Sequence, residues 1–112
     1  MLIPKHNYIR DRKYRKWLST LSCVVTDHPD TQAAHIKYKG MAGMSKKSSD
    51  NRCLPLYHME HTVQHSMTEK AYWSQYGGIE AAIELAEDLY RVRYNDDKAH
   101  EIIREWRKLW MK

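Results

Sequence analysis

The passage across residues 54–65, Leu-Pro-Leu-Tyr-His-Met-Glu-His-Thr-Val-Gln-His, constrains the fold more than any other stretch. It opens as a short apolar strand, which we expect Pro55 to end, and then continues without a breaker as a predicted helix. On that helix His61 and His65 are four residues apart and share a face, and His58 falls on the same face. Two imidazoles at this spacing can chelate one cation, although the same pair also occurs on ordinary solvated helices.

The composition indicates a single basic domain. The chain has 112 residues, with 19 Lys and Arg against 14 Asp and Glu, and it carries seven His. This balance favours a polyanionic partner, first nucleic acid and second an anionic membrane surface. We expect a reduced, cytoplasmic protein, because the chain has only two cysteines, no secretory signal, and no run near the ~18–20 apolar residues of a membrane span.

Basic residues gather at the start of the chain, and we treat residues 1–16 as a basic N-terminal segment. Its candidate nucleic-acid contacts are Arg10, Arg12, Lys13, Arg15 and Lys16. Residues 10–21 predict a short amphipathic helix, since Tyr14, Trp17, Leu18 and Leu21 recur at helical spacing with the basic residues opposite. The basic face suits phosphates, but a charged helix face or a frayed tail that merely meets water is equally consistent with this pattern.

The middle of the chain predicts two short strands and a long loop. Residues 23–26 are strand-like and end at an Asp-His-Pro-Asp turn, and residues 31–38 predict a second strand with His35 near its end. Residues 39–53 are rich in Gly, Ser and Lys and lack periodicity, so we expect a loop. The cations in or beside this loop are further candidates for contact with a phosphate backbone: Lys37, Lys46, Lys47 and Arg52.

The last third of the chain predicts helices. Residues 68–76 form a short helix capped at Thr68 and stopped by Gly77 and Gly78. Residues 79–93 and 98–110 form two amphipathic helices separated by an Asn-Asp-Asp turn. We interpret residues 78–112 as a helical extension that serves as scaffold, and no repeat or linker pattern indicates a second domain.

The order of these elements is a strand carrying His35, a loop, a second strand and a His-bearing helix. In this order the chain resembles the HNH nucleases, the ββα-metal or His-Me finger group. The likeness is to phage-type HNH domains, and the matching pieces are Ala34-His35-Ile36, the Gly-Met-Ser-Lys-Lys-Ser-Ser-Asp of residues 43–50, and residues 55–65. Residues 66–73 and the helix after Gly78 also resemble the tail of those domains. The resemblance implies an α+β fold, with a small ββα-metal core in a single HNH-like domain over residues 17–112, flanked by an N-terminal helix and C-terminal helices.

The resemblance also implies a role for each matching residue. His35 would act as general base on a water, and His61 and His65 would hold one divalent cation against the scissile phosphate. The position of the motif's Asn falls at Asp50 or Asn51, either of which would brace the loop next to the base. An all-imidazole set favours a transition metal such as Zn²⁺, Ni²⁺ or Mn²⁺, while Mg²⁺ with substrate oxygens stays open.

Two departures from the family pattern affect these roles. The pairs that hold a structural zinc in many members read Cys23-Val-Val-Thr26 and Tyr57-His-Met-Glu60 here, so we predict no structural zinc. Ala34 stands where many motifs have Asp or His. If His35 matches the second residue of that motif pair it is the base, and if it matches the first it is a third metal ligand with no evident base. We favour the first, because Ile follows the base in many such motifs.

The leading prediction is a metal-dependent, phage-encoded endonuclease that hydrolyses phosphodiester bonds in DNA during recombination or DNA processing. It would contact the backbone independently of sequence, and RNA is a second substrate to consider. One alternative is a catalytically degenerate HNH-fold module that only binds nucleic acid. Another is a small helical interaction protein whose histidines are incidental. The sequence leaves the oligomeric state open.

Overall fold

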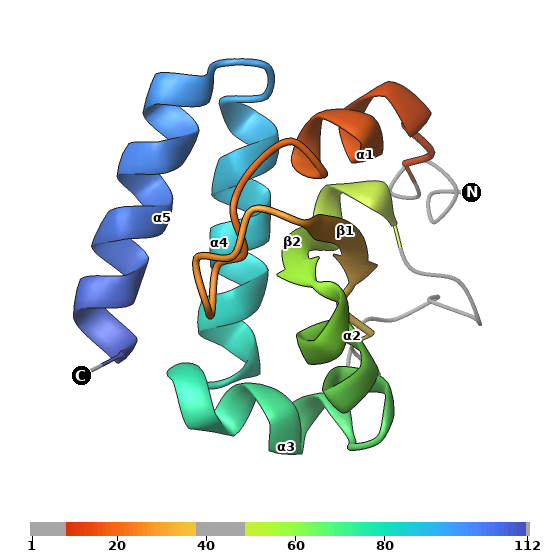
Figure 1. Cartoon of the computed structure of the whole chain (residues 1–112), viewed down its shortest axis with the longest axis vertical. Coiled ribbons are helices and arrows are strands. Elements are labelled where there is room, and N and C mark those ends of the chain that lie inside the picture. Colours follow the sequence, from red (N-terminus) through yellow and green to blue (C-terminus); the bar gives the residue numbers. More distant parts are fainter. Residues whose placement is uncertain (1–8, 38–48, 112) are drawn as a thin grey trace, which may run out of the picture.

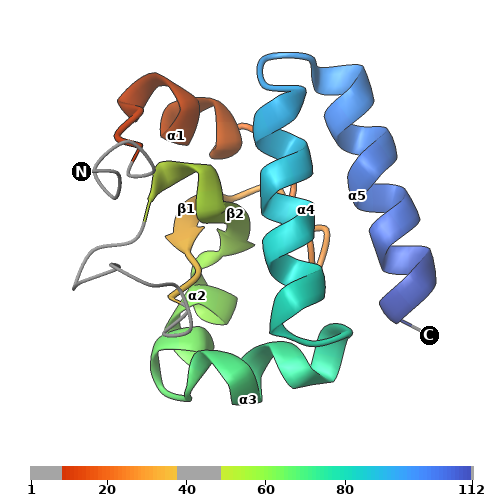
Figure 2. The same ribbon diagram turned by 180° about the vertical axis from the view of Figure 1, so that it is seen from behind.

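The computed structural model describes residues 9–37 and 49–111, and all elements below refer to these residues. They form an α+β fold with five α-helices and one two-stranded sheet. Helix α4 (Ile79–Arg91) lies between α5 (Asp96–Trp110) and the sheet, α1 (Arg12–Leu18) packs at one end, and α3 (Glu69–Trp73) crosses the other (Figure 1 and, from behind, Figure 2). No described helix is both long enough and apolar enough to span a bilayer.

The sheet pairs two segments that are distant in sequence. Strand β1 (Thr31–His35) runs antiparallel to β2 (Cys53–Tyr57), with His35 opposite Cys53. Our expectation that Pro55 ends the strand is wrong, because Pro55 lies in the middle of β2 opposite Ala33. Each strand of a two-stranded sheet has a free edge, where the missing N–H of proline removes no ladder hydrogen bond. On that edge the Pro55 carbonyl accepts from the Val24 N–H at 3.1 Å.

Residues 23–26 form a turn rather than the strand that we expected. The Cys23 N–H donates to the His28 carbonyl, and the Asp27 N–H donates to the Cys23 carbonyl, both at 2.9 Å. Asp27 has a left-handed φ of 65°, which Asp tolerates better than most residues. Val24 and Val25 are buried in the core. Their apolar character therefore reflects burial within a turn, which periodicity cannot distinguish from a short buried strand.

The His-bearing helix follows the sheet directly, as predicted. Helix α2 (His58–His65) begins immediately after β2, with Tyr57 as its N-cap residue. The predicted N-terminal helix is also present but shorter at both ends, because α1 starts after Asp11 and ends at Leu18. The Asp11 side chain caps that helix by accepting from the Tyr14 N–H at 3.0 Å.

The C-terminal helices agree with the prediction. Thr68 caps α3, the 3₁₀ turn η3 (Ser74–Tyr76) follows, and Gly77 ends it with a φ of 90°. Helices α4 and α5 occupy the two predicted amphipathic segments, with Asn95 as the N-cap of α5.

One hydrophobic core connects these elements. It receives buried side chains from the sheet and from α1, α3, α4 and α5. Tyr14 belongs to the predicted basic segment, yet it is fully buried and packs edge-on against Tyr90 of α4 at 4.8 Å. Helix α2 adds no hydrophobic residue to the fully buried set; its one buried side chain is Gln64. The core thus fixes α1 through its inner face and leaves α2 at the surface.

Candidate metal centre

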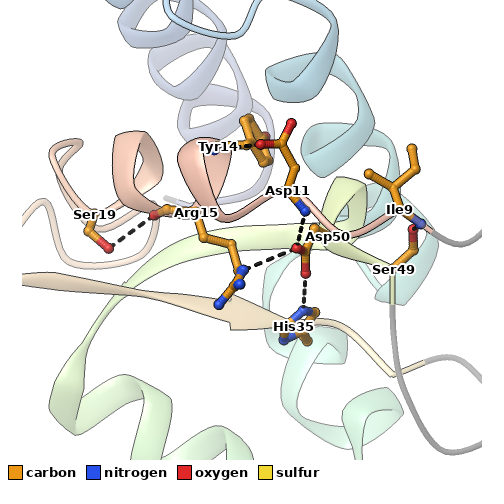
Figure 3. A network of polar contacts seen from close by, with 8 residues as sticks. All are labelled: Ile9, Asp11, Tyr14, Arg15, Ser19, His35, Ser49 and Asp50. Atoms are coloured by element: carbon orange, nitrogen blue, oxygen red, sulfur yellow. Dashed lines mark hydrogen bonds and ion pairs between the residues drawn. The ribbon is translucent and has the colours of Figure 1, made fainter.

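His35 ends β1 beside a buried carboxylate from the 3₁₀ turn η2 (Asp50–Arg52). His35 Nε2 lies 2.8 Å from Asp50 Oδ1, while Asp50 Oδ2 accepts from the Asp11 backbone N–H at 2.6 Å and from Arg15 Nε at 3.0 Å (Figure 3). Burial alone would raise the pKa of Asp50, but the hydrogen bonds from Asp11 and His35 and the charge of Arg15 hold that pKa below its ordinary value. Asp50 is therefore an ionised and fully buried acceptor.

This contact fixes the tautomer and orientation of His35. Because an ionised carboxylate only accepts hydrogen bonds, Nε2 of His35 carries a proton and Nδ1 is the ring nitrogen left for other chemistry. The backbone is held as well. The His35 carbonyl accepts from Gln64 Nε2 at 3.1 Å, and the Ile36 N–H donates to the Arg52 carbonyl at 2.8 Å. His35 is thus anchored from both η2 and α2.

The predicted histidine pair on α2 has the geometry of a chelate. His61 Nε2 and His65 Nε2 lie 3.0 Å apart, and His61 Nδ1 lies 2.8 Å from the side-chain oxygen of Gln32 on β1. Since an amide oxygen accepts, Nδ1 of His61 carries the proton and the Nε2 lone pair of neutral His61 faces His65. Two nitrogens each about 2.0–2.1 Å from one tetrahedral zinc ion would lie about 3.3 Å apart. The pair therefore fits a shared cation.

The surroundings of His61 favour its neutral form. Burial lowers the pKa of His61 below its ordinary value, and the charges of His65 and His35 lower that pKa further. Two hydrogen bonds hold α2 against β1: Gln64 Nε2 donates to the His35 carbonyl, and His61 Nδ1 contacts the side-chain oxygen of Gln32. The lowered pKa favours neutral His61, which is the form that binds metal ions.

A second group with metal-binding composition lies deeper. His35, Asp50 and Cys53 each offer a ligand atom, and these atoms lie within 4.8 Å of one another, so the group could hold a metal ion. Cys53 is fully buried, and burial together with the Asp50 charge raises the pKa of its thiol to about 12. The Asp50 carboxylate already accepts three hydrogen bonds, and a cation would displace one of those donors.

The structure separates the two candidates for the Asn position of the motif. Asp50 bonds His35, whereas Asn51 Oδ1 is buried with no hydrogen-bond partner within the described residues. Arg52, a predicted phosphate contact, donates from Nε and Nη2 to Glu87 Oε2 on α4 at 3.0 and 2.7 Å. That ion pair joins η2 to α4 and supports the turn that carries Asp50.

The other predicted phosphate contacts gather on α1 and after β1. Those that are exposed are Arg10, Arg12, Lys13, Lys16 and Lys37. Arg15 is partly buried by its bond to Asp50. Lys46 and Lys47 lie outside the described residues. The exposed cations of α1 project from the helix whose opposite face is anchored in the core, so their positions are defined by packing.

Other contacts join the segments where the resemblance would place a structural zinc. Tyr57 stacks on His28 with ring centroids 3.8 Å apart, and Glu60 Oε1 accepts from the Tyr72 hydroxyl at 2.7 Å. Cys23 is buried as a free thiol. Aromatic stacking and a tyrosine–carboxylate hydrogen bond therefore connect the start of α2 to the 23–28 turn and to α3.

Two glutamines that orient the histidines were not predicted as site residues from the sequence. Gln32 fixes the ring of His61, and Gln64 holds the His35 carbonyl. Gln64 had a weak signal, since it lies three residues after His61 and so shares a helix face with it. Gln32 had none, because it reads as an ordinary exposed strand residue and its partner is 29 positions away.

Comparison with known proteins supplies a family and no function. No curated protein and no solved structure significantly matches the chain. Residues 1–90 match the model of a family described as a protein of unknown function, DUF968. The match includes the candidate centre, ends within α4 and leaves α5 outside it. Since it covers most of the chain, this protein is a member of the DUF968 family.

Proposed function

We propose that this DUF968 member is a metal-dependent, HNH-type endonuclease that hydrolyses phosphodiester bonds in DNA. The observation that carries the proposal is a close histidine pair on α2, a helix that is bonded to the strand carrying His35. His61 and His65 have Nε2 atoms 3.0 Å apart, and Gln64 of the same helix donates to the carbonyl of His35, whose Nε2 contacts Asp50. The order of β1, β2 and α2 is the order that the HNH resemblance implies, and it supports the proposal further.

In this proposal His35 is the general base. Its Nδ1 lone pair takes a proton from a water molecule as the water oxygen attacks phosphorus and the bond to the departing 3′ oxygen breaks. Asp50 holds the Nε2 proton and stabilises the imidazolium that forms, without taking the proton itself. Asp50 is thus a positioning residue. This assignment makes His35 the base of the Ala34-His35 pair rather than a third metal ligand.

His61 and His65 would hold one divalent cation through their Nε2 atoms. When bound, such a cation stabilises the negative charge that develops on the phosphate and the departing oxygen. Gln32 keeps the Nε2 lone pair of His61 available by accepting a hydrogen bond from Nδ1. The imidazole ligands favour Zn²⁺, Ni²⁺ or Mn²⁺, and Mg²⁺ is the alternative that relies on oxygen ligands from the substrate.

The charge of the chain supports a polyanionic substrate. The sequence pI is about 9.2, and exposed cations on α1 can contact phosphates without reading bases. DNA is the substrate proposed, and an RNA of equal length is the comparison that tests this choice.

Plasmid relaxation with Mn²⁺, Mg²⁺ or Zn²⁺ tests the proposal. His35→Ala should lower the rate about 10²–10⁴-fold, the range for loss of a general base, while calorimetric metal binding persists. His61→Ala should abolish both metal binding at the pair and cleavage. His100→Ala, at an exposed position on α5, is the matched control and should behave as wild type. Cleavage that survives both EDTA and His35→Ala would contradict the mechanism.

A second candidate is a catalytically degenerate module that binds nucleic acid without cutting it. Ala34 favours this candidate, because it is fully buried opposite Leu54 and offers no ligand to a cation at the α2 pair. The module would show salt-sensitive DNA binding and no cleavage with any metal. Metal-dependent cleavage that is lost in His35→Ala would exclude it.

A further inference from the structure

A shallow pocket lies between α1 and β1, next to the candidate metal centre. It has a volume of 290 Å³, and its lining includes Arg12, Arg15, Lys16, Ser19, Thr31 and Gln32. Three of the described residues that line it are cations and none is an acid. We propose that this pocket binds a phosphodiester phosphate of a nucleic-acid strand, adjacent to the phosphate that is cleaved. The inference rests on the proposed function, since it adds a second phosphate site to the same substrate.

The cations of the pocket are available to an external anion. Arg12 and Lys16 are four residues apart on the exposed side of α1, and they form no ion pair with any described residue. Arg15 bonds Asp50 through Nε, and this contact holds its guanidinium between α1 and β1 (Figure 3). An anion entering the pocket would therefore meet two unpaired cations and a third that is already oriented.

The pocket wall is rigid on the side of the sheet. The Thr31 hydroxyl donates to the Leu21 carbonyl at 2.7 Å and also lies 3.2 Å from the carbonyl of Ser19, the C-cap residue of α1. These bonds fix the end of α1 against the start of β1. A site whose walls are already held in place loses little conformational entropy when its ligand binds.

Gln32 joins the pocket to the metal centre. The same side chain lines the pocket and accepts from His61 Nδ1 at 2.8 Å, so Gln32 adjoins both the pocket and the His61–His65 pair. Arg15 makes a second link, because it shares the Asp50 carboxylate with His35. A strand with one phosphate at the metal centre would thus present a neighbouring phosphate to the pocket.

The chemistry of the pocket indicates recognition of the backbone rather than of bases. Its described lining contains no aromatic ring on which a base could stack. Phosphate contacts position a strand without reading its sequence. The pocket would therefore set which backbone bond reaches His35, and it would do so for any sequence.

Equilibrium binding in EDTA tests the pocket without metal or cleavage. The probe is a fluorescent thymidine decamer, titrated by anisotropy at several KCl concentrations against wild type and Arg12→Gln/Lys16→Gln. We expect this variant to bind about tenfold more weakly at low salt and its salt slope to fall by about 0.7, the value for one phosphate of a single strand. Arg12→Lys/Lys16→Arg should restore binding, because it keeps both charges.

The charge-matched control is Lys98→Gln/Arg104→Gln, which removes two exposed cations from α5, on the far side of α4 (Figure 1). An equal loss of decamer affinity in this control would overturn the proposed phosphate site, since the loss would then depend only on net charge. A titration with inorganic phosphate separates the anion site from the strand: the side-chain amide signal of Gln32 should shift in wild type and stay fixed in Arg12→Gln/Lys16→Gln. A Gln32 signal that does not shift in wild type would also overturn the proposed phosphate site. If decamer binding follows these expectations and plasmid cleavage fails, the pocket stands and the nuclease proposal falls.

Discussion

Gln32 is the residue through which the sheet controls the histidine pair. It is an exposed residue of β1, and its amide oxygen holds the Nδ1 proton of His61. Without that acceptor the His61 ring can rotate, and either nitrogen can carry the proton. The geometry of the candidate metal centre therefore depends on a residue that binds no metal itself.

Gln32→Leu should lower the affinity for Zn²⁺ or Mn²⁺ about 10–100-fold, the usual cost of removing an outer-shell partner of a ligating histidine. Isothermal titration calorimetry measures this directly and does not depend on cleavage. Gln32→Glu is the control, because its carboxylate still accepts from Nδ1 and should keep the affinity. Equal affinities for Gln32→Leu and wild type would show that the pair does not hold the metal.

At the scale of elements, the connection from α3 to α4 is shaped by the end of α5. Gly77 has a φ of 90°, and a Cβ built on it would lie 2.4 Å from Cδ2 of Trp110. The indole thus packs on the backbone of the connection, which only a residue without a side chain allows. Gly78 has a φ of 98°, but nothing lies within 4 Å of its Cβ position.

Gly77→Ala should destabilise the fold by about 2–4 kcal/mol, from the left-handed backbone and the clash together. In a Trp110→Ala background the clash disappears, and the cost should fall to about 1–2 kcal/mol. Urea unfolding of the four proteins in this cycle measures the difference. Gly78→Ala should cost the same in both backgrounds. If Gly77→Ala lowers the free energy of unfolding equally with Trp110 and with Ala at position 110, the indole does not pack on Gly77.

Local patterns were enough to predict most of the helices. The side chains of Thr68 and Asn95 cap α3 and α5 by accepting from backbone N–H groups at 3.0 and 3.1 Å. Caps, glycines and helical spacing act within a few residues, so a single sequence carries them. For the same reason the sequence predicts that His61 and His65 share a helix face, and α2 places their Nε2 atoms together.

Features that depend on distant partners could not be predicted. Pro55 fits in β2 because that strand has a free edge, which only the sheet topology reveals. Val24 and Val25 are buried in a turn that other elements cover. The choice of Asp50 over Asn51 as the partner of His35 depends on Arg15 and on the Asp11 backbone, which lie 35 and 39 positions away. The burial of the Asp50 carboxylate depends on the tertiary fold, so the local sequence does not reveal it.

At the scale of the whole molecule, Asp50 is a junction between three segments. Its carboxylate joins the start of α1, the end of β1 and its own turn η2, which the Arg52–Glu87 pair ties to α4. The carboxylate that positions the proposed base is thus also part of what holds the fold together. Its protonation should therefore be visible in the stability of the entire chain.

Acid should destabilise the protein through Asp50. Its folded pKa is depressed, so its contribution is complete above the unfolded value of about 3.9 and is lost as the pH falls through the folded pKa. Asp50→Asn should cost about 2 kcal/mol at pH 7, and the gap to wild type should shrink below about pH 4. Urea unfolding across this range tests it, with exposed Asp30→Asn as the control. A gap that is constant with pH would exclude the ionised carboxylate as its source.

The burial of Cys53 has a practical consequence for measuring motion. Both thiols are free and fully buried, and Cys53 pairs with His35 across the sheet. A thiol reagent can reach Cys53 only when the strands separate or the core opens. In a Cys23→Ala variant, the labelling rate of Cys53 therefore measures the rate of the opening events that expose the interior beneath His35. A native thiol thus reports how often the strand that carries the proposed base opens to solvent.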